Sequence, residues 1–352
     1  MNNKEILEKF QLNGDVLEII PFGNGLINKT YKIVTSTGDK YLFQAVNGYV
    51  FHNIDDLMRN IFIVTNYLIR KGKATLEIVK TRHGRLYFND GEMYYRVYKY
   101  IRKSISYEKI DNLDLVNKVA QGFGQLHNDL ADLDPCLISE TIKDFHNTPK
   151  RFDNLMDTIK EDPVGRVKEC GEYISFVCTE QYYIDALIKA LENEEIPERI
   201  VHNDPKINNV LFSRETNEIL CVIDLDTIMP GTCLFDVGDA LRSLFTGDNE
   251  SNPDSSVMKV NFDVYERFVS SYLKEMNGSI TKKEVELIPV SVATIALELG
   301  IRFLEDYIKG DKYFGTKFEG ENLVRARGQF ALAKDVIKNM DKLEEITERY
   351  SK

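Results

Sequence analysis

The chain has 352 residues, of which 43% are hydrophobic and 29% charged, and its formal net charge is −11 at pH 7. A chain of this length and hydrophobic content can bury the core of one large domain or of two domains packed together. The acidic balance argues against binding to nucleic acid or to an anionic membrane surface, because both need clustered Lys and Arg. We therefore expect small molecules as partners.

The cysteines and the N-terminus indicate the compartment. The five cysteines form no C-x-x-C pair and have no metal-ligand spacing with the five histidines, which predicts free thiols in a reducing compartment. The first residues lack the apolar segment of a signal peptide, and no uncharged apolar run reaches the roughly 20 residues that span a bilayer. We expect a cytoplasmic monomer or weak homodimer without a membrane partner.

The apolar pattern predicts an α+β fold with two lobes. Alternating residues favour antiparallel strands within 15–46, and further strands are expected near 76–80 and 93–101. Between them, Asn53 as N-cap and Gly72 as terminator bound a helix from about Ile54 to Lys71. From Leu113 onward the spacing is helical, except for a hairpin near 210–224 and a loop at 246–256. We expect an N-lobe of residues 1–101 and a mainly helical C-lobe of residues 102–352.

The most informative segment lies between Ile200 and Phe212. It contains His202, Asp204 and Asn209 in the pattern H-x-D-x-x-x-x-N, and Asp224 follows fifteen residues after Asn209 in the pattern I-D-x-D. Phosphoryl transfer from ATP needs a carboxylate that orients the acceptor and oxygen ligands for Mg²⁺ beside the triphosphate. The spacing predicts Asp204 as the catalytic residue and Asn209 and Asp224 as metal ligands. The alternative is a turn-rich segment without chemistry, and the ordered combination argues against it.

Neighbouring residues complete this predicted site. Lys206, two residues after Asp204, is expected beside the γ-phosphate of ATP, and His202 is expected to support the loop rather than to carry protons. Asp236 or Asp239, at the start of the next helix, could hold the loop through hydrogen bonds to its backbone. Simple helix N-capping by Asp236 is the alternative.

Two N-terminal segments are candidates for nucleotide binding. The turn with Gly23, Asn24 and Gly25 resembles a glycine-rich phosphate cover, although a hairpin turn without a ligand has the same composition. The segment with Tyr98 and Tyr100 lies where a hinge between the lobes would offer backbone hydrogen bonds to adenine.

Gln44 stands at the strand position where the V-A-I-K sequence of protein kinases carries its phosphate-binding Lys. The helix that follows also lacks a Glu in its body, so the lysine–glutamate pair of those kinases is absent. Lys206 or Arg59 could supply the missing positive charge. The substitution keeps open the alternative of a catalytically silent pseudokinase.

From Pro21 to about Gln329 the sequence resembles the N-acetylhexosamine 1-kinases, relatives of choline kinases and aminoglycoside phosphotransferases with a protein-kinase-like fold. Besides the motif above, the resemblance rests on Leu57–Asn60, Arg96–Lys99, Ile223–Gly231, Arg302–Leu304 and Asn322–Arg325. That family also carries Gln at the Lys position, which makes Gln44 a family trait. Phe62 departs from the pattern, because an acidic residue is expected there.

The resemblance implies Mg²⁺-dependent transfer of the γ-phosphoryl group of ATP to the anomeric hydroxyl of GlcNAc or GalNAc. It also implies that Arg302 and Tyr313 contact the sugar, with His146 and Arg151 on the acceptor side. For Arg302 the alternative is an ion pair with a neighbouring carboxylate of the same helix, and for His146 a buried structural role. Choline, homoserine, a hexosamine without the acetyl group or an aminoglycoside are the alternative acceptors.

Overall fold

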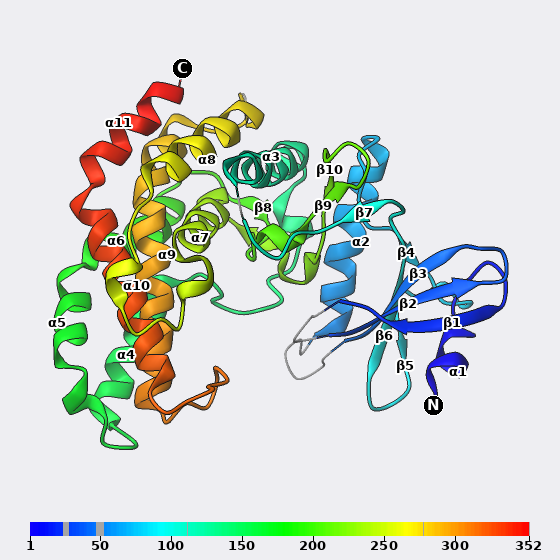
Figure 1. The fold of residues 1–352 in the computed structure, drawn as a ribbon, viewed down its shortest axis with the longest axis horizontal. Helices are drawn as coiled ribbons and strands as arrows, with labels where there is room; N and C mark the ends of the chain where they lie inside the picture. The colour runs from blue at the N-terminus through cyan, green and yellow to red at the C-terminus, as the bar shows by residue number, and fades with distance from the viewer. Residues whose placement is uncertain (24–27, 47–52, 111, 277, 352) are drawn as a thin grey trace. The chain divides into compact units, whose positions relative to one another are not determined.

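The computed structural model describes residues 1–23, 28–46, 53–110, 112–276 and 278–351. The chain divides into two units (Figure 1). Unit 1 comprises residues 1–106, 132–143 and 210–230, and unit 2 comprises residues 107–131, 144–209 and 231–352. The segments 132–143 and 210–230 therefore belong with the N-terminal residues, although they come much later in the chain.

Unit 1 is built on an antiparallel sheet whose strands follow the order β1-β2-β3-β6-β4, with β5 also paired to β6. Its strands and helices are α1 (Asn3–Leu7), β1 (Val16–Pro21), β2 (Lys29–Thr35), β3 (Lys40–Val46), α2 (Ile54–Arg70), β4 (Ile78–Val79), β5 (Phe88–Asn89) and β6 (Tyr94–Lys99). Phe43 and Val97 are fully buried in its core with Ile6 and Phe10 of the N-terminal segment. The expected strands and the expected helix, capped by Asn53, are confirmed, and α2 ends one residue earlier than predicted.

A smaller sheet in unit 1 contains the predicted hairpin. Strands β7 (Ser104–Ile105), β9 (Val210–Ser213) and β10 (Ile219–Val222) pair in the order β10-β9-β7. The 3-10 helix η4 (Leu225–Thr227) follows β10. The buried Asn60 of α2 bonds both backbone groups of Ser139, and its Nδ2 also donates to the Ile228 oxygen at 3.2 Å. This side chain explains why two late segments belong to unit 1.

Unit 2 is mainly helical. Its elements are α3 (Leu113–Leu130), α4 (Thr148–Glu161), η2 (Val167–Glu169), α5 (Gly171–Thr179), α6 (Gln181–Glu192), β8 (Arg199–Val201), η3 (Ile207–Asn209), α7 (Cys233–Thr246), η5 (Gly247–Asn249), η6 (Ser255–Val257), α8 (Phe262–Glu275), α9 (Lys282–Ile308), α10 (Glu321–Lys338) and α11 (Met340–Tyr350). The expected loop at 246–256 thus contains the 3-10 helix η5 and the start of η6. A sheet-based unit and a helical unit together confirm the predicted α+β fold.

Helix α9 forms the centre of unit 2 and packs against α4, α6, α7 and α10 (Figure 1). A capping box of Thr281 and Glu284 begins it. Among the described residues, α9 is the helix that is long and apolar enough to cross a bilayer, but 89% of its most apolar stretch is buried inside the protein. Such burial is expected for the core helix of a globular unit.

Candidate active site

The loop that carries Asp204 follows strand β8 in unit 2 and is held by a carboxylate of α7. The backbone N–H groups of His202 and Asn203 donate to the two oxygens of Asp236, at 2.7 and 2.6 Å. Asn203 has a left-handed backbone, with φ of 64°, which turns the chain sharply beside α7. Of the two predicted candidates, Asp236 and not Asp239 therefore accepts these bonds.

Asp236 is itself held by the buried side chain of His127, which is held in turn by Tyr272. Its Oδ2 lies 2.8 Å from Nε2 of His127, and Nδ1 of His127 lies 2.8 Å from the hydroxyl of Tyr272. Burial alone would raise the pKa of Asp236, but His127 and the backbone of His202 hold it below its ordinary value. Sequence reasoning missed His127 and Tyr272, since each lies within an ordinary apolar helix stripe.

Asp204 is surrounded by polar groups of its own loop. Its Oδ1 lies 2.6 Å from Nζ of Lys206, and its backbone N–H donates to Nδ1 of the fully buried His202 at 3.2 Å. Nδ2 of Asn209 donates to the backbone oxygen of Asp204 at 2.8 Å and to its Oδ2 at 3.2 Å. Because the amide nitrogen of Asn209 is used in this way, its Oδ1 is the atom left to accept a ligand. The structure thus brings together the predicted residues of this loop.

A second carboxylate of α7, that of Asp239, acts electrostatically on Lys206. Asp239 accepts from Nε of Arg242 at 2.7 Å, and its charge also acts on Lys206 and on His146. Burial favours the neutral amine of Lys206, but Asp204 and then Asp239 raise the pKa of Lys206 above its ordinary value. Lys206 is therefore a retained cation next to Asp204.

Asp224, the other predicted metal ligand, belongs to unit 1. It directly precedes η4, its backbone is left-handed (φ 59°, ψ 56°), and its side chain is exposed. Two residues later, Asp226 is buried and forms a two-point ion pair with Arg96, with Nη1–Oδ1 at 2.6 Å and Nη2–Oδ2 at 2.9 Å. Nδ2 of Asn28 also donates to Oδ2 of Asp226 at 2.8 Å.

Gln44 extends the hydrogen-bonded chain of polar side chains that Arg96 and Asp226 form, which we call the polar chain. Its Oε1 accepts from Nε of Arg96 at 2.9 Å, and its Nε2 donates to the hydroxyl of Thr30 at 3.0 Å. Both ends of the amide are therefore used inside unit 1. Arg96 and Asp226 both lie within motifs that carry the family resemblance, but the sequence predicted no partner for either of them.

Tyr98 and Tyr100, the predicted nucleotide-binding residues of the hinge, lie in or directly after strand β6 of the main sheet. Tyr98 is buried in β6, opposite Leu42 of β3 on one side and Ile78 of β4 on the other. The N–H of Tyr100 donates to the Lys40 oxygen at 3.0 Å. This N–H is therefore not available to adenine, which differs from the expectation for Tyr100.

The predicted phosphate-covering turn is described only in part. Gly23 has φ of 77° and open space where a side chain would begin. Asn24 and Gly25 lie outside the described residues.

His146 and Arg302, both predicted on the acceptor side, lie in unit 2. Nδ1 of His146 is 2.9 Å from Oε1 of the buried Glu298, whose Oε2 accepts from Thr148 at 2.8 Å. The Arg302 guanidinium lies over two aromatic rings, 5.8 Å from the centroid of Phe145 and 5.5 Å from that of Phe314. Within the described ranges it forms no ion pair, so the alternative of a helix ion pair for Arg302 is not what the structure contains.

Tyr313 lies on a loop that Asp306 holds. The Asp306 carboxylate accepts from the backbone N–H groups of Lys312, Tyr313 and Phe314 at 2.8–2.9 Å. The side chain of Tyr313 is 75% exposed, so its hydroxyl is open to a ligand. The sequence did not predict this role of Asp306.

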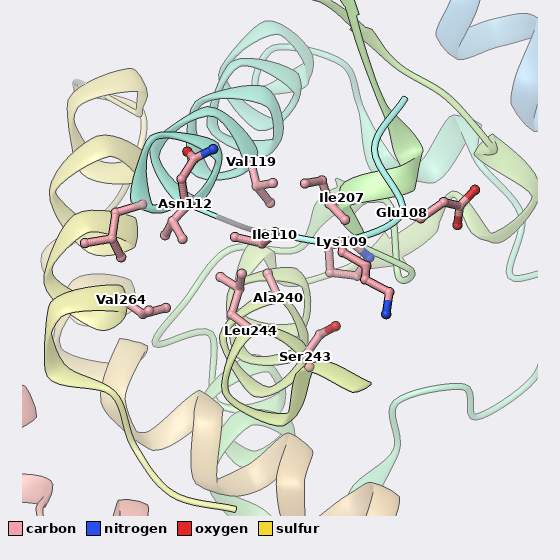
Figure 2. A pocket seen from close by; sticks show the side chains of 14 residues that line it. Glu108, Lys109, Ile110, Asn112, Val119, Ile207, Ala240, Ser243, Leu244 and Val264 are labelled. Atoms are coloured by element: carbon pink, nitrogen blue, oxygen red, sulfur yellow. The ribbon is translucent and has the colours of Figure 1, made fainter. Parts of the chain in front are cut away.

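A cavity of about 430 Å³ lies in unit 2 beside the Asp204 loop (Figure 2). Pro205 and Ile207 of that loop line it together with apolar side chains of α3, α7 and α8. Asp204, Lys206 and Asn209 do not line it. The cavity therefore does not coincide with the groups predicted to react.

The profile of the phosphotransferase enzyme family matches residues 18–268. The chain belongs to this family. An aminoglycoside phosphotransferase from Alicyclobacillus acidocaldarius has a similar structure, with a TM-score of 0.64 at 14% identity, covering 99% of this chain and 97% of that one. A choline kinase from Cryptosporidium parvum gives a TM-score of 0.59 at 14% identity, covering 97% of this chain and 95% of that one.

An amicoumacin kinase, solved in complex with AMP-PNP, Ca²⁺ and Ami, gives a TM-score of 0.54 at 14% identity over 90% of this chain and 88% of that one. At such identities the likeness concerns the fold alone. It confirms the predicted protein-kinase-like fold of aminoglycoside-phosphotransferase type. The family match makes this chain a phosphotransferase.

Proposed function

We propose that this phosphotransferase is an ATP- and Mg²⁺-dependent N-acetylhexosamine 1-kinase of the cytoplasm. It would transfer the γ-phosphoryl group of ATP to the anomeric hydroxyl of GlcNAc or GalNAc. The observation that carries the chemistry is the Asp204 loop, whose backbone is fixed by Asp236 and whose carboxylate is flanked by Lys206 and Asn209. A pre-positioned carboxylate and cation are what phosphoryl transfer requires of a protein.

In this proposal Asp204 accepts a hydrogen bond from the anomeric hydroxyl and directs its oxygen at the γ-phosphorus. As the new O–P bond forms and the bond from phosphorus to the bridging oxygen of ADP breaks, the hydroxyl proton passes to Asp204. Lys206, kept protonated by Asp204, donates to an oxygen of the transferring group. Asp236 keeps the loop in place throughout, because its two oxygens are both committed to that backbone.

We expect Asn209 and Asp224 each to offer a side-chain oxygen to a magnesium ion. Mg²⁺ prefers hard oxygen ligands, and here one is an amide oxygen whose own nitrogen is already bonded to Asp204, and the other is an exposed carboxylate. When bound, the ion would neutralise charge on the phosphate oxygens. The nucleotide would be covered by residues 1–101, with the Gly23 turn near its phosphates, and the acceptor would be bound by residues 102–352.

The acceptor residues support a sugar over a cationic acceptor. Arg302 and Arg151 are both cations on the expected acceptor side, and Glu298 raises the pKa of His146 although burial opposes this. Choline or an aminoglycoside, which carry cationic groups and no carboxylate, would be repelled by such a site. The hydroxyl and carbonyl oxygens of an N-acetylhexosamine accept hydrogen bonds from it.

The test is a panel of acceptors incubated with the enzyme, ATP and Mg²⁺ and followed by phosphorus NMR. We expect a sugar 1-phosphate signal with GlcNAc or GalNAc and none with choline, homoserine or glucose. If only choline or only homoserine were phosphorylated, that compound and not an N-acetylhexosamine would be the acceptor. Nucleotide binding without transfer to any acceptor would favour the pseudokinase alternative.

A further inference from the structure

Two arginines of unit 2 approach the same phenylalanine from different helices. Nη2 of Arg151, in α4, donates to the backbone oxygen of Phe145 at 3.3 Å. The guanidinium of Arg302, in α9, lies 5.8 Å from the centre of the Phe145 ring. We call Arg151 and Arg302 the guanidinium pair. Neither forms an ion pair with any residue in the described part of the chain.

Three carboxylates on α9, the helix that carries Arg302, have other partners. Glu298 binds His146 and Thr148, and Glu305 binds Lys309. Asp306 accepts from the backbone of the 312–314 segment and from Asn322. The positive charge of the pair is therefore not balanced by a contacting carboxylate of the protein.

The surroundings of Arg151 disfavour its charged form. Burial and then the neighbouring charge of Arg302 lower the pKa of Arg151 below its ordinary value. In addition, Nε of Arg151 and Nε2 of His146 are buried without a hydrogen-bond partner among the described residues. Buried donors without acceptors cost folding free energy, so an arrangement of this kind calls for an explanation in ligand binding.

The surroundings of the guanidinium pair are linked electrostatically to the catalytic loop. His146 follows Phe145 directly, and its charge acts on Asp239, whose charge also acts on Lys206. The half-buried Asp239 of α7 is thus within electrostatic range of both the catalytic loop and the residue next to the pair. A ligand held by the pair would therefore share unit 2 with Asp204.

We propose that the guanidinium pair binds an anionic oxygen group, a carboxylate or a phosphate monoester, that the acceptor carries in addition to the hydroxyl to be phosphorylated. Guanidinium groups bind carboxylate and phosphate through paired N–H donors, and such charge-assisted bonds are stronger than bonds to neutral oxygens. A derivative of the sugar acceptor that carries such a group would then bind more tightly than the neutral sugar, which remains an acceptor. The proposal rests on the phosphotransferase site described above, but not on the identity of the sugar.

The experiment compares GlcNAc with two acidic relatives, its 6-phosphate and its 6-carboxylate (the uronic acid). Calorimetry without ATP gives the dissociation constant of each compound, and steady-state assays with ATP and Mg²⁺ give kcat/KM. We expect at least one acidic compound to bind about tenfold or more tightly than GlcNAc, as one to two charge-assisted bonds would provide. Comparing the two acids shows whether carboxylate or phosphate is the source of the preference.

Variants assign the preference to the pair. Arg151→Gln and Arg302→Gln should each remove most of the advantage of the acidic compound and change the affinity for GlcNAc less. Arg327→Gln is the matched control, because Arg327 lies in the same unit and donates to the neutral hydroxyl of Tyr173. Thermal melting of each variant verifies folding, and Arg151→Lys, which keeps the charge, should retain part of the preference.

Equal affinities for neutral and acidic sugars would overturn the proposal while leaving the kinase assignment intact. A preference for acidic sugars that survives both Arg→Gln substitutions would also overturn it, since the anion would then bind elsewhere. Binding that depends on Arg151 without turnover of any sugar supports the anion site and instead contradicts the proposed reaction.

Discussion

Arg96 and Asp226 form a buried two-point ion pair in unit 1, although 130 residues separate them in the chain. Arg96 also donates to Gln44, the residue at the position of the phosphate-binding Lys of protein kinases. Asp226 lies two residues after the predicted metal ligand Asp224. These polar side chains therefore connect strand β3, strand β6 and the turn that carries Asp224. Gln44 forms hydrogen bonds within this group through both its amide oxygen and its amide nitrogen.

Removing Arg96 should destabilise the protein strongly. Arg96→Met leaves Asp226 buried without its partner, which typically costs about 3–5 kcal/mol of unfolding free energy. Urea unfolding followed by circular dichroism would measure this loss. Arg96→Met combined with Asp226→Leu should recover much of it, because no buried charge then remains.

The control is Lys99→Met, three residues along the same strand. Lys99 pairs with Glu77 at 2.6 Å, but both side chains are largely exposed, so its loss should cost less than about 1 kcal/mol. A similar cost for Arg96→Met and Lys99→Met would contradict the structural importance assigned to the buried pair.

Asp204→Asn and Asp224→Ala should each abolish turnover and leave the fold intact. Asn at position 204 cannot accept the hydroxyl proton, and Ala at position 224 removes an oxygen ligand from the proposed metal site. We expect kcat to fall by about 10²–10⁴, the usual contribution of a general base, with an unchanged melting curve. A near-normal kcat in either variant would remove that residue from the mechanism.

Lys206→Met should raise KM for ATP more than Gln44→Ala does. Lys206 is a cation beside Asp204, whereas the Gln44 amide is neutral and already bonded to Arg96 and Thr30. Because charged groups bind phosphate more strongly than neutral amides, the two variants separate a role in nucleotide binding from a structural role. Gln44→Ala should mainly lower stability in urea, and equal effects on KM for ATP would instead favour a phosphate contact for Gln44.

The sequence predicted the overall fold for physical reasons that are local. Strand alternation in 15–46 and the helical spacing from Leu113 are periodic signals, and Asn53 marks a helix start by its own chemistry. The contacts of Arg96, Asp226 and Gln44 were beyond this reasoning, because they depend on the register of β3 against β6 and on a segment far along the chain. The roles of the site residues remain predictions, since geometry shows which groups meet but not which ligand they bind.

The ion pair of His146 with Glu298 should make stability depend on pH. Burial would lower the pKa of His146, but Glu298 outweighs it and raises that pKa above its ordinary value. The pair therefore contributes its full stabilisation below the unfolded pKa of about 6.5 and loses it as the pH rises through the folded value. Urea unfolding of wild type and His146→Gln between about pH 5.5 and 8.5, roughly 1.5 units on either side of neutrality, should show a difference in unfolding free energy that shrinks with rising pH.

His83→Gln is the control for this titration, because His83 is exposed on a turn of unit 1, whereas Glu298 belongs to unit 2. A stability difference between wild type and His146→Gln that stays constant over the pH range would contradict the charged pair.

The last prediction concerns which oxygen of the sugar is phosphorylated. An anomeric hydroxyl is more acidic than the other hydroxyls of a sugar, so a single carboxylate such as Asp204 suffices to orient it and to receive its proton in a loose transition state. If Arg302 and Tyr313 bind the opposite side of the ring, the anomeric end faces Asp204. Arg302→Ala should then raise KM for the sugar and leave KM for ATP nearly unchanged, as expected for a residue that contacts the acceptor alone.

Substrate blocking makes this prediction decisive. The methyl glycoside of GlcNAc keeps every ring substituent but has no free anomeric hydroxyl, so we expect it to inhibit competitively against GlcNAc and to accept no phosphate. Phosphorus NMR of the reaction with ATP and Mg²⁺ detects transfer to any position. A phosphate on the methyl glycoside would show that the enzyme uses a different hydroxyl, because the anomeric oxygen of that compound cannot be phosphorylated, and the assignment would then be reduced to a sugar kinase of another regiochemistry.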